Sequence, residues 1–246
     1  MTHTTSSKGT RVLGFLSLIG IGWVVALGLF MSPDDFVQGD LVRIMYVHVP
    51  MAWLMYLSFG ITAVGSAMYL WRRSQWWDLV AASSAEIGVL LCGLALVTGS
   101  IWGRPTWGSY WEWGDARLVS TLVLFLIFVG YLAVRQIPAE THLRSRRSAI
   151  VGLIGAVNIP LVHFSVEWWR TLHQDATILT PDFDPKLDDL MLFTLFLAMV
   201  VGTLMYSWML LHRFRMAWLE EQLLEYSLDD AIDSRRAEAT TQEVIS

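Results

Sequence analysis

Two kinds of side chain with distinctive chemistry recur in this sequence, imidazoles and indoles. The stretch WGSYWEWGDARL, residues 107–118, holds three tryptophans, a tyrosine, two carboxylates and an arginine in twelve positions. Histidines lie at His48 in IMYVHVPMAW, and at His163 and His173 in NIPLVHFSVEWWRTLHQ. A neutral imidazole is a good ligand for iron, and an indole offers a broad, stiff apolar face. Together such residues could hold a large flat ring that carries a metal.

The composition predicts that these residues are positioned by membrane-spanning helices. Of the 246 residues, 54% are hydrophobic and only 16% are charged, well below the usual quarter for soluble domains. A helix needs about 20 apolar residues to cross a bilayer. The apolar runs of suitable length cover residues 12–31, 47–70, 79–101, 119–134, 149–168 and 190–211. We therefore expect an all-α polytopic membrane protein, a bundle of six transmembrane helices.

The basic residues near the helix ends predict the orientation of this bundle. Positively charged loops stay in the cytoplasm. If the chain alternates, one face of the membrane receives Lys8, Arg11, Arg72, Arg73, Arg135, Arg144, Arg146, Arg147, Arg213 and Arg215. The opposite loops are rich in aspartate and hold only Arg43, Arg104, Arg117, Arg170 and Lys186. Both termini are thus predicted to be cytoplasmic, and the tryptophan-rich loop, about 102–117, to face outward.

The two ends of the chain differ from the expected bundle. The first apolar run follows Lys8 and Arg11 as in a signal peptide, but it is longer than a signal core and lacks an A-x-A cleavage pattern, which favours a retained anchor. After residue 212 the sequence becomes polar, which predicts a short surface helix and then a disordered end. We expect a membrane domain over residues 1–212 and a cytoplasmic tail over 213–246. The single cysteine, Cys92, excludes a disulfide framework.

In this topology three histidines and the tryptophan-rich loop converge on the outer face. Haem suits this set, since two imidazoles can clamp its iron and indoles can support its ring. Arg117 or Arg104 could pair with the propionates. Ligands at the outer ends of helices would hold haem at the membrane surface, within reach of an outer protein. One alternative is an aromatic belt without a cofactor, which explains Trp53, Trp71, Trp76 and Trp77.

Three stretches resemble the CcmC family of cytochrome c maturation. They are RIMYVHVPMAW, LVTGSIWGRPTWGSYWEWGDARLVS and VNIPLVHFSVEWWRTLHQ, and the likeness runs from the first to the last span. The resemblance implies that His48 and His173 are the axial ligands of haem iron, with His163 as the rival on spacing alone. It also places the family's tryptophan motif on Trp107, Gly108, Trp111, Trp113 and Asp115, with Arg117 beside it. The family pattern lacks Gly114, which here separates Trp113 from Asp115 and could shift that carboxylate.

The resemblance further implies a function and partners. The family binds haem b non-covalently and transiently at the outer face of the cytoplasmic (inner) membrane, and delivers it to the periplasmic haem chaperone CcmE. Its other partners are the single-span subunit CcmD, the ABC-type ATPase CcmA and the membrane subunit CcmB. No nucleophile with a partner base occurs, so we expect no enzyme, and nothing in the sequence indicates nucleic-acid binding. A membrane b-type cytochrome in electron transfer and a transport or structural bundle are the alternatives.

Overall fold

Six long helices make up most of the computed structural model, which describes residues 6–169, 171–173 and 187–245. They are α1 (Lys8–Ala26), α2 (Met45–Arg72), α3 (Gln75–Trp107), α4 (Ala116–Gln136), α5 (Thr141–Trp168) and α6 (Asp189–Ile245). A π-helical turn, η1 (Leu27–Met31), extends α1, and a 3-10 turn, η2 (Asp40–Ile44), precedes α2. The described residues contain no β-strand, and all six long helices are long and apolar enough to cross a membrane. The expected all-α, six-span fold is confirmed.

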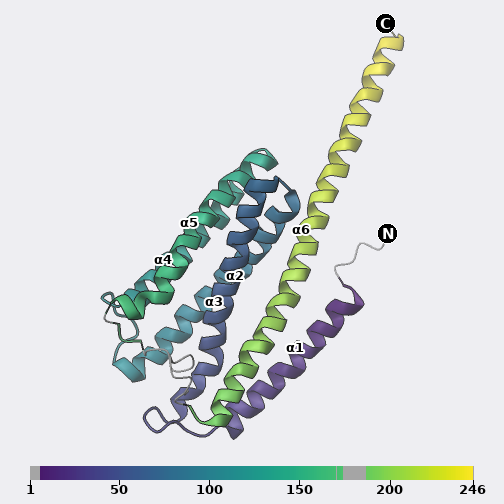
Figure 1. The fold of residues 1–246 in the computed structure, drawn as a ribbon. Helices are drawn as coiled ribbons and strands as arrows, with labels where there is room; N and C mark the ends of the chain where they lie inside the picture. The colour runs from purple at the N-terminus through teal and green to yellow at the C-terminus, as the bar shows by residue number, and fades with distance from the viewer. Residues whose placement is uncertain (1–5, 170, 174–186, 246) are drawn as a thin grey trace.

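The helices pack as a bundle with α2 at its centre (Figure 1). Helix α2 contacts α3, α5 and α6, α4 pairs with α5, and α1 packs chiefly on α6. The start of α1 and the end of α6 lie toward one end of the bundle, whereas residues 32–44, 108–115 and 171–173 lie at the other (Figure 1). We call the latter the tryptophan end. The structure thus places the start of the first helix and the end of the last on the same side, and which side faces the cytoplasm stays a prediction from the arginine pattern.

Aromatic stacking and short polar side chains join α2 to its neighbours. Phe59 of α2 stacks on Phe128 of α4 with ring centroids 3.8 Å apart. The hydroxyl of Ser58 donates to the carbonyl of Ser84, and the Ser84 hydroxyl lies 2.7 Å from that of Tyr206. In lipid, small residues that let helices approach and interhelical hydrogen bonds hold a bundle together, because the surrounding lipid is as apolar as the helices. These contacts fix the register of α2, α3 and α6.

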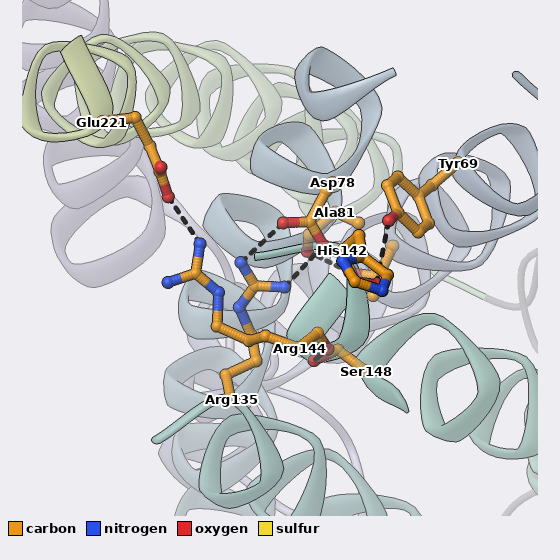
Figure 2. A network of polar contacts seen from close by, with 9 residues as sticks. Tyr69, Asp78, Ala81, Arg135, His142, Arg144, Ser148 and Glu221 are labelled. Carbon is orange, nitrogen blue, oxygen red and sulfur yellow. Dashed lines mark hydrogen bonds and ion pairs between the residues drawn. The ribbon is translucent and has the colours of Figure 1, made fainter. Parts of the chain in front are cut away.

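The opposite end, near the turns 73–74 and 137–140, is called the arginine end, and it carries ion pairs between helices. Figure 2 shows the guanidinium of Arg135 turned toward the carboxylate of Asp78, with two nitrogen–oxygen distances of 2.7 and 2.9 Å. Asp78 is only 2% exposed, so this bidentate pair locks α3 to α4. Arg144 of α5 similarly reaches Glu221 of α6 at 2.6 Å (Figure 2).

Several element boundaries differ from those expected. Helix α6 is one helix through Ile245, where we expected irregular chain after a short helix. Helix α2 begins at Met45, two residues before the apolar run 47–70, so Pro50 lies in its second turn. Trp107 belongs to the last turn of α3 and not to the loop. Of the outer-face charges used for orientation, Arg170, Asp175, Asp182, Asp184 and Lys186 lie outside the described residues.

Candidate functional site

The last two turns of α3 place one indole against each of two histidines. Trp102 meets His48 of α2 edge-on, with ring centroids 5.7 Å apart. Trp107 packs against His173, which follows α5, at 4.9 Å. Trp102 and Trp107 lie five residues apart on α3, so both histidines lie against the same end of this helix. The structure therefore brings together, at the tryptophan end, the two histidines that the sequence singled out.

The imidazole of His48 is held against α3 by a hydroxyl and a glycine. Its Nδ1 lies 3.1 Å from the hydroxyl oxygen of Thr98. That hydroxyl donates its hydrogen to the carbonyl of Leu94 at 2.7 Å. A side chain at Gly99 would not fit, because a Cβ there would lie 2.9 Å from Cε1 of His48. The His48 ring can approach α3 this closely only because Gly99 has no side chain.

Asp115 joins the segment that carries His173 to the start of α4. One oxygen of its carboxylate accepts from the backbone amide of Leu118 at 2.9 Å, which caps α4. The other oxygen accepts from the amide of Leu172 at 2.7 Å. Nδ1 of His173, which is buried and has no hydrogen-bond partner among the described residues, lies 3.8 Å from the carboxylate. Asp115 is thus a structural clamp beside the imidazole, and its side chain is 1% exposed.

The surroundings of Asp115 keep it ionised. Burial raises the pKa of its carboxyl, but the neighbouring His173 imidazole and the amides of Leu118 and Leu172 outweigh burial and lower the pKa to about 2. The carboxylate is therefore charged over the whole physiological pH range. An ionised carboxylate is only an acceptor, so it favours an N–H on the ring nitrogen that faces it.

The loop 108–115 exposes aromatic rings at this end. Gly108 ends α3 with φ +82°, a left-handed conformation that suits glycine. Beyond it, Trp111 and Trp113 meet edge-on at 5.5 Å, and Trp113 is 74% exposed. The indole nitrogen of Trp111 is buried and has no partner among the described residues. Tyr110, Trp168 and Trp169 are also exposed at this end. The result is a broad aromatic surface at the tryptophan end of the bundle.

The two arginines expected at a ring's rim already have protein partners. Arg117 donates to the carbonyl of His163 at 2.8 Å and lies 3.4 Å from the Ser165 hydroxyl, which ties α4 to α5. Arg104 donates to the carbonyl of Gly108 and lies over the Tyr110 ring. Each guanidinium has five N–H donors, so these contacts leave donors available for a carboxylate.

His163, the rival to His173, has a different environment. Its ring meets Tyr56 edge-on at 6.0 Å and Phe164 at 4.9 Å. It lies on α5, before the helix ends at Trp168, and its side chain is exposed. It has neither the tryptophan of α3 nor the carboxylate that flank His173.

Gly114, the residue inserted in the motif, does not need to be glycine. Its φ is not in the left-handed region, and a Cβ there would meet nothing within 4 Å. Gly114 therefore introduces no bend that only glycine could adopt. The clamp made by Leu118 and Leu172 sets the position of Asp115 instead.

Sequence reasoning missed three residues of this site, Thr98, Gly99 and Trp102. They lie within the stretch LVTGSIWGRPTW, which was noticed for its resemblance only. The spacing of five residues between Trp102 and Trp107 was the only pattern in the sequence that could have pointed to Trp102 as a site residue. Their pairing with His48 depends on how α2 and α3 pack, which no local pattern shows.

Comparisons with known proteins agree with the resemblance. The profile of the family described as CcmC, heme exporter protein C, matches residues 2–228. The chain belongs to this family. It is 41% identical to the heme exporter protein C of Bradyrhizobium diazoefficiens over 199 residues, covering 80% of this chain and 74% of that protein. It is 39% identical to that of Haemophilus influenzae over 217 residues, covering 87% and 86%.

A plant relative extends the comparison. A putative cytochrome c biosynthesis ccmC-like mitochondrial protein of Marchantia polymorpha is 40% identical over 166 residues, which cover 65% of this chain and 70% of that protein. Membership of the family and the six apolar helices together make this chain a multi-pass membrane protein.

The donor set at the tryptophan end fits haem. It contains two imidazoles on separate segments, each with a flanking indole. It also contains a buried indole N–H without a partner, at Trp111, which is a donor suited to a propionate or water. The described residues hold no group of three or more histidine, cysteine or acidic side chains that would suit a bare metal ion. An iron that arrives inside its own ring needs only the axial ligands from the protein.

Proposed function

We propose that this protein binds haem b at the outer face of the cytoplasmic (inner) membrane and delivers it to the periplasmic chaperone CcmE for cytochrome c biogenesis. One observation carries the proposal. His48 and His173 come from distant parts of the chain, and each is flanked by a tryptophan of α3 at the same end of the bundle. A pair of neutral imidazoles is the ligand set of a b-type haem, held without a covalent bond.

The proposed roles follow from this placement. His48 and His173 are the axial ligands, and the tryptophans of the motif form the platform. Gly108 lets the chain turn beneath that platform. Arg117 offers its remaining donors to a propionate, as does Arg104. When bound, the haem supplies the redox-active iron, and the protein supplies only ligands, orientation and an apolar surface. We therefore propose a carrier and not an enzyme.

The site's position at the end of the bundle supports handover. The exposed rings of Tyr110, Trp113, Trp168 and Trp169 offer a surface at which an outer protein can approach the haem edge. The proposed partners are CcmE for delivery, and CcmD, CcmA and CcmB as the other subunits of the exporter. Residues 1–212 form the haem-handling membrane domain in this proposal, and residues 213–246 form its cytoplasmic tail.

A visible spectrum of the purified protein tests the proposal. We expect a Soret band of a low-spin haem. The His48→Ala and His173→Ala variants should each shift or weaken this band, while His163→Ala should leave it unchanged. A protein without a Soret band after expression with ample haem would contradict haem binding. A change in His163→Ala but not in His173→Ala would contradict the ligand assignment.

Transfer of haem to CcmE tests the delivery step. Trp107→Ala and Trp111→Ala should slow transfer, whereas Trp76→Ala, at the arginine end against Phe214, should not. If haem transfer and the amount of inserted protein fall equally in all three variants, the tryptophans act as an aromatic belt. Haem that is reduced by quinol but never transferred would favour a b-type cytochrome.

A further inference from the structure

The polar groups behind the two histidines indicate which nitrogen of each ring is free. Thr98 has a single hydroxyl hydrogen, which it gives to the carbonyl of Leu94 at 2.7 Å. Its oxygen can therefore only accept in the contact with Nδ1 of His48 at 3.1 Å. That contact requires a hydrogen on Nδ1. In a neutral ring the free lone pair is then on Nε2.

The carbonyl of Ala95 supports the same assignment for His48. It lies 3.3 Å from the Thr98 hydroxyl, on the same turn of α3. Whether the hydroxyl donates to Leu94 or to Ala95, its hydrogen is used within α3. The Thr98 oxygen can therefore only accept from the ring nitrogen that faces it.

Asp115 has the corresponding position behind His173. Its carboxylate lies 3.8 Å from the buried Nδ1, so an approach of about 1 Å gives a normal hydrogen bond. Both carboxylate oxygens already accept backbone amides, from Leu118 and Leu172, and these bonds hold the carboxylate in place. Trp107 packs against the ring at 4.9 Å and limits its rotation.

We propose that Thr98 and Asp115 are positioning residues that fix both imidazoles with the hydrogen on Nδ1, so that both rings present Nε2 to the iron. The hydrogen bond at the second ring nitrogen sets the tautomer and the donor strength of a ligating histidine. A carboxylate strengthens the donor more than a hydroxyl does. His173 is therefore the stronger ligand and His48 the weaker one.

The unequal strengths of the two histidine ligands determine the order of events in handover. The weaker bond, to His48, is the one that breaks first when haem leaves. This inference rests on the proposed function for the role of the iron, but the tautomers themselves exist without haem. They can therefore be measured separately.

Nitrogen NMR of ¹⁵N-histidine-labelled, haem-free protein in detergent tests the tautomers. Single His48→Ala and His173→Ala variants assign the two rings. We expect both neutral rings to carry the hydrogen on Nδ1. Thr98→Val, which keeps the shape and removes the acceptor, should move the hydrogen of His48 toward Nε2, and Thr98→Ser should restore the parent signal. His48 with its hydrogen on Nε2 in the parent, or no change in Thr98→Val, would overturn the proposal.

The haem-loaded protein tests the unequal strengths. A carboxylate behind the ligand stabilises ferric iron, so Asp115→Asn should raise the midpoint potential, and by more than Thr98→Val does. An unchanged potential in Asp115→Asn, with the low-spin spectrum retained, would overturn the role of Asp115. If the tautomers are as expected but the parent protein binds no haem, the proposed function fails and the tautomer assignment stands.

Discussion

At the scale of single residues, the site depends on what lies behind each histidine. His48 contacts a hydroxyl and a glycine of one helix, whereas His173 contacts an indole and lies 3.8 Å from a buried carboxylate. Each ring is packed against an indole of α3, which restricts its rotation. A ligand set that is held in this way before the cargo arrives loses little entropy when it binds.

Gly99 is the residue whose replacement should displace His48 most directly. A methyl group there would lie 2.9 Å from Cε1 of His48, so Gly99→Ala must move the ring. Overpacking of this kind costs about 1 kcal/mol or more, which corresponds to a loss of haem affinity of roughly fivefold or more. Titration with haem, monitored by the Soret band, measures the affinity of the variant and of the parent protein.

Gly93→Ala, on the same helix as Gly99, is the matched control, because its methyl group would make an ordinary 3.5 Å contact with Phe125 of α4. It should bind haem like the parent protein. Equal affinities in the Gly99→Ala and Gly93→Ala variants would show that His48 does not depend on its contact with α3.

The two glycines of the tryptophan loop should respond differently to alanine. Gly108 has φ +82°, so Gly108→Ala should cost about 1 kcal/mol in stability and disturb the end of α3. Gly114→Ala should be neutral, since its backbone is ordinary and the space beside it is open. Thermal unfolding in detergent, together with the haem spectrum, compares them. A larger effect at Gly114 than at Gly108 would contradict this account of the loop.

At the scale of elements, α3 connects the two ends of the molecule. Its first turn holds Asp78 against Arg135 of α4, and its last turns hold Trp102 and Trp107 against the histidines. The helix therefore carries a structural ion pair at one end and the candidate site at the other. Substitutions in the ion pair should therefore affect stability, and substitutions at the other end of α3 should affect haem binding.

Breaking the Asp78–Arg135 pair should destabilise the bundle without changing the ligands. Asp78→Asn leaves a buried guanidinium without its charged partner, which costs about 3–5 kcal/mol. The double variant Asp78→Asn, Arg135→Gln removes both charges and should recover part of the loss. Thermal unfolding measures stability, and the haem spectrum of the surviving protein should match that of the parent.

The exposed pair of His142 with Glu140, at 3.3 Å, provides the control for that experiment. Glu140→Gln should leave the unfolding temperature unchanged, because exposed ion pairs contribute little. A loss of stability in Glu140→Gln as large as in Asp78→Asn would show that burial of the pair is not the cause.

At the scale of the whole molecule, the orientation in the membrane decides whether the site faces the chaperone. The tryptophan end is predicted to lie outside and the arginine end inside. A cysteine at Gly114, which is exposed, should react with an impermeant maleimide in intact cells. A cysteine at Ala139, exposed in the turn at the arginine end, should react only after the cells are opened. The reverse pattern would contradict the proposed delivery.

The native protein suits this labelling. Its only cysteine, Cys92, is buried in the bundle core and should give little background. Ser145, another candidate position on the inner side, is fully buried and would stay unlabelled in either orientation. Exposed positions such as Ala139 are therefore required for a decisive result.

The sequence by itself determined the number of spans, and it predicted that the termini share one side and which residues form the main site. Long apolar runs and basic loop residues are local features of the sequence. In a membrane, the runs form spanning helices and the basic residues set their orientation. The pairing of Thr98 with His48, fifty residues apart, and of Asp115 with Leu172, fifty-seven apart, follows only from how the helices pack. Tertiary structure also decided that Gly114 is ordinary, because backbone angles and open space depend on the surrounding chain.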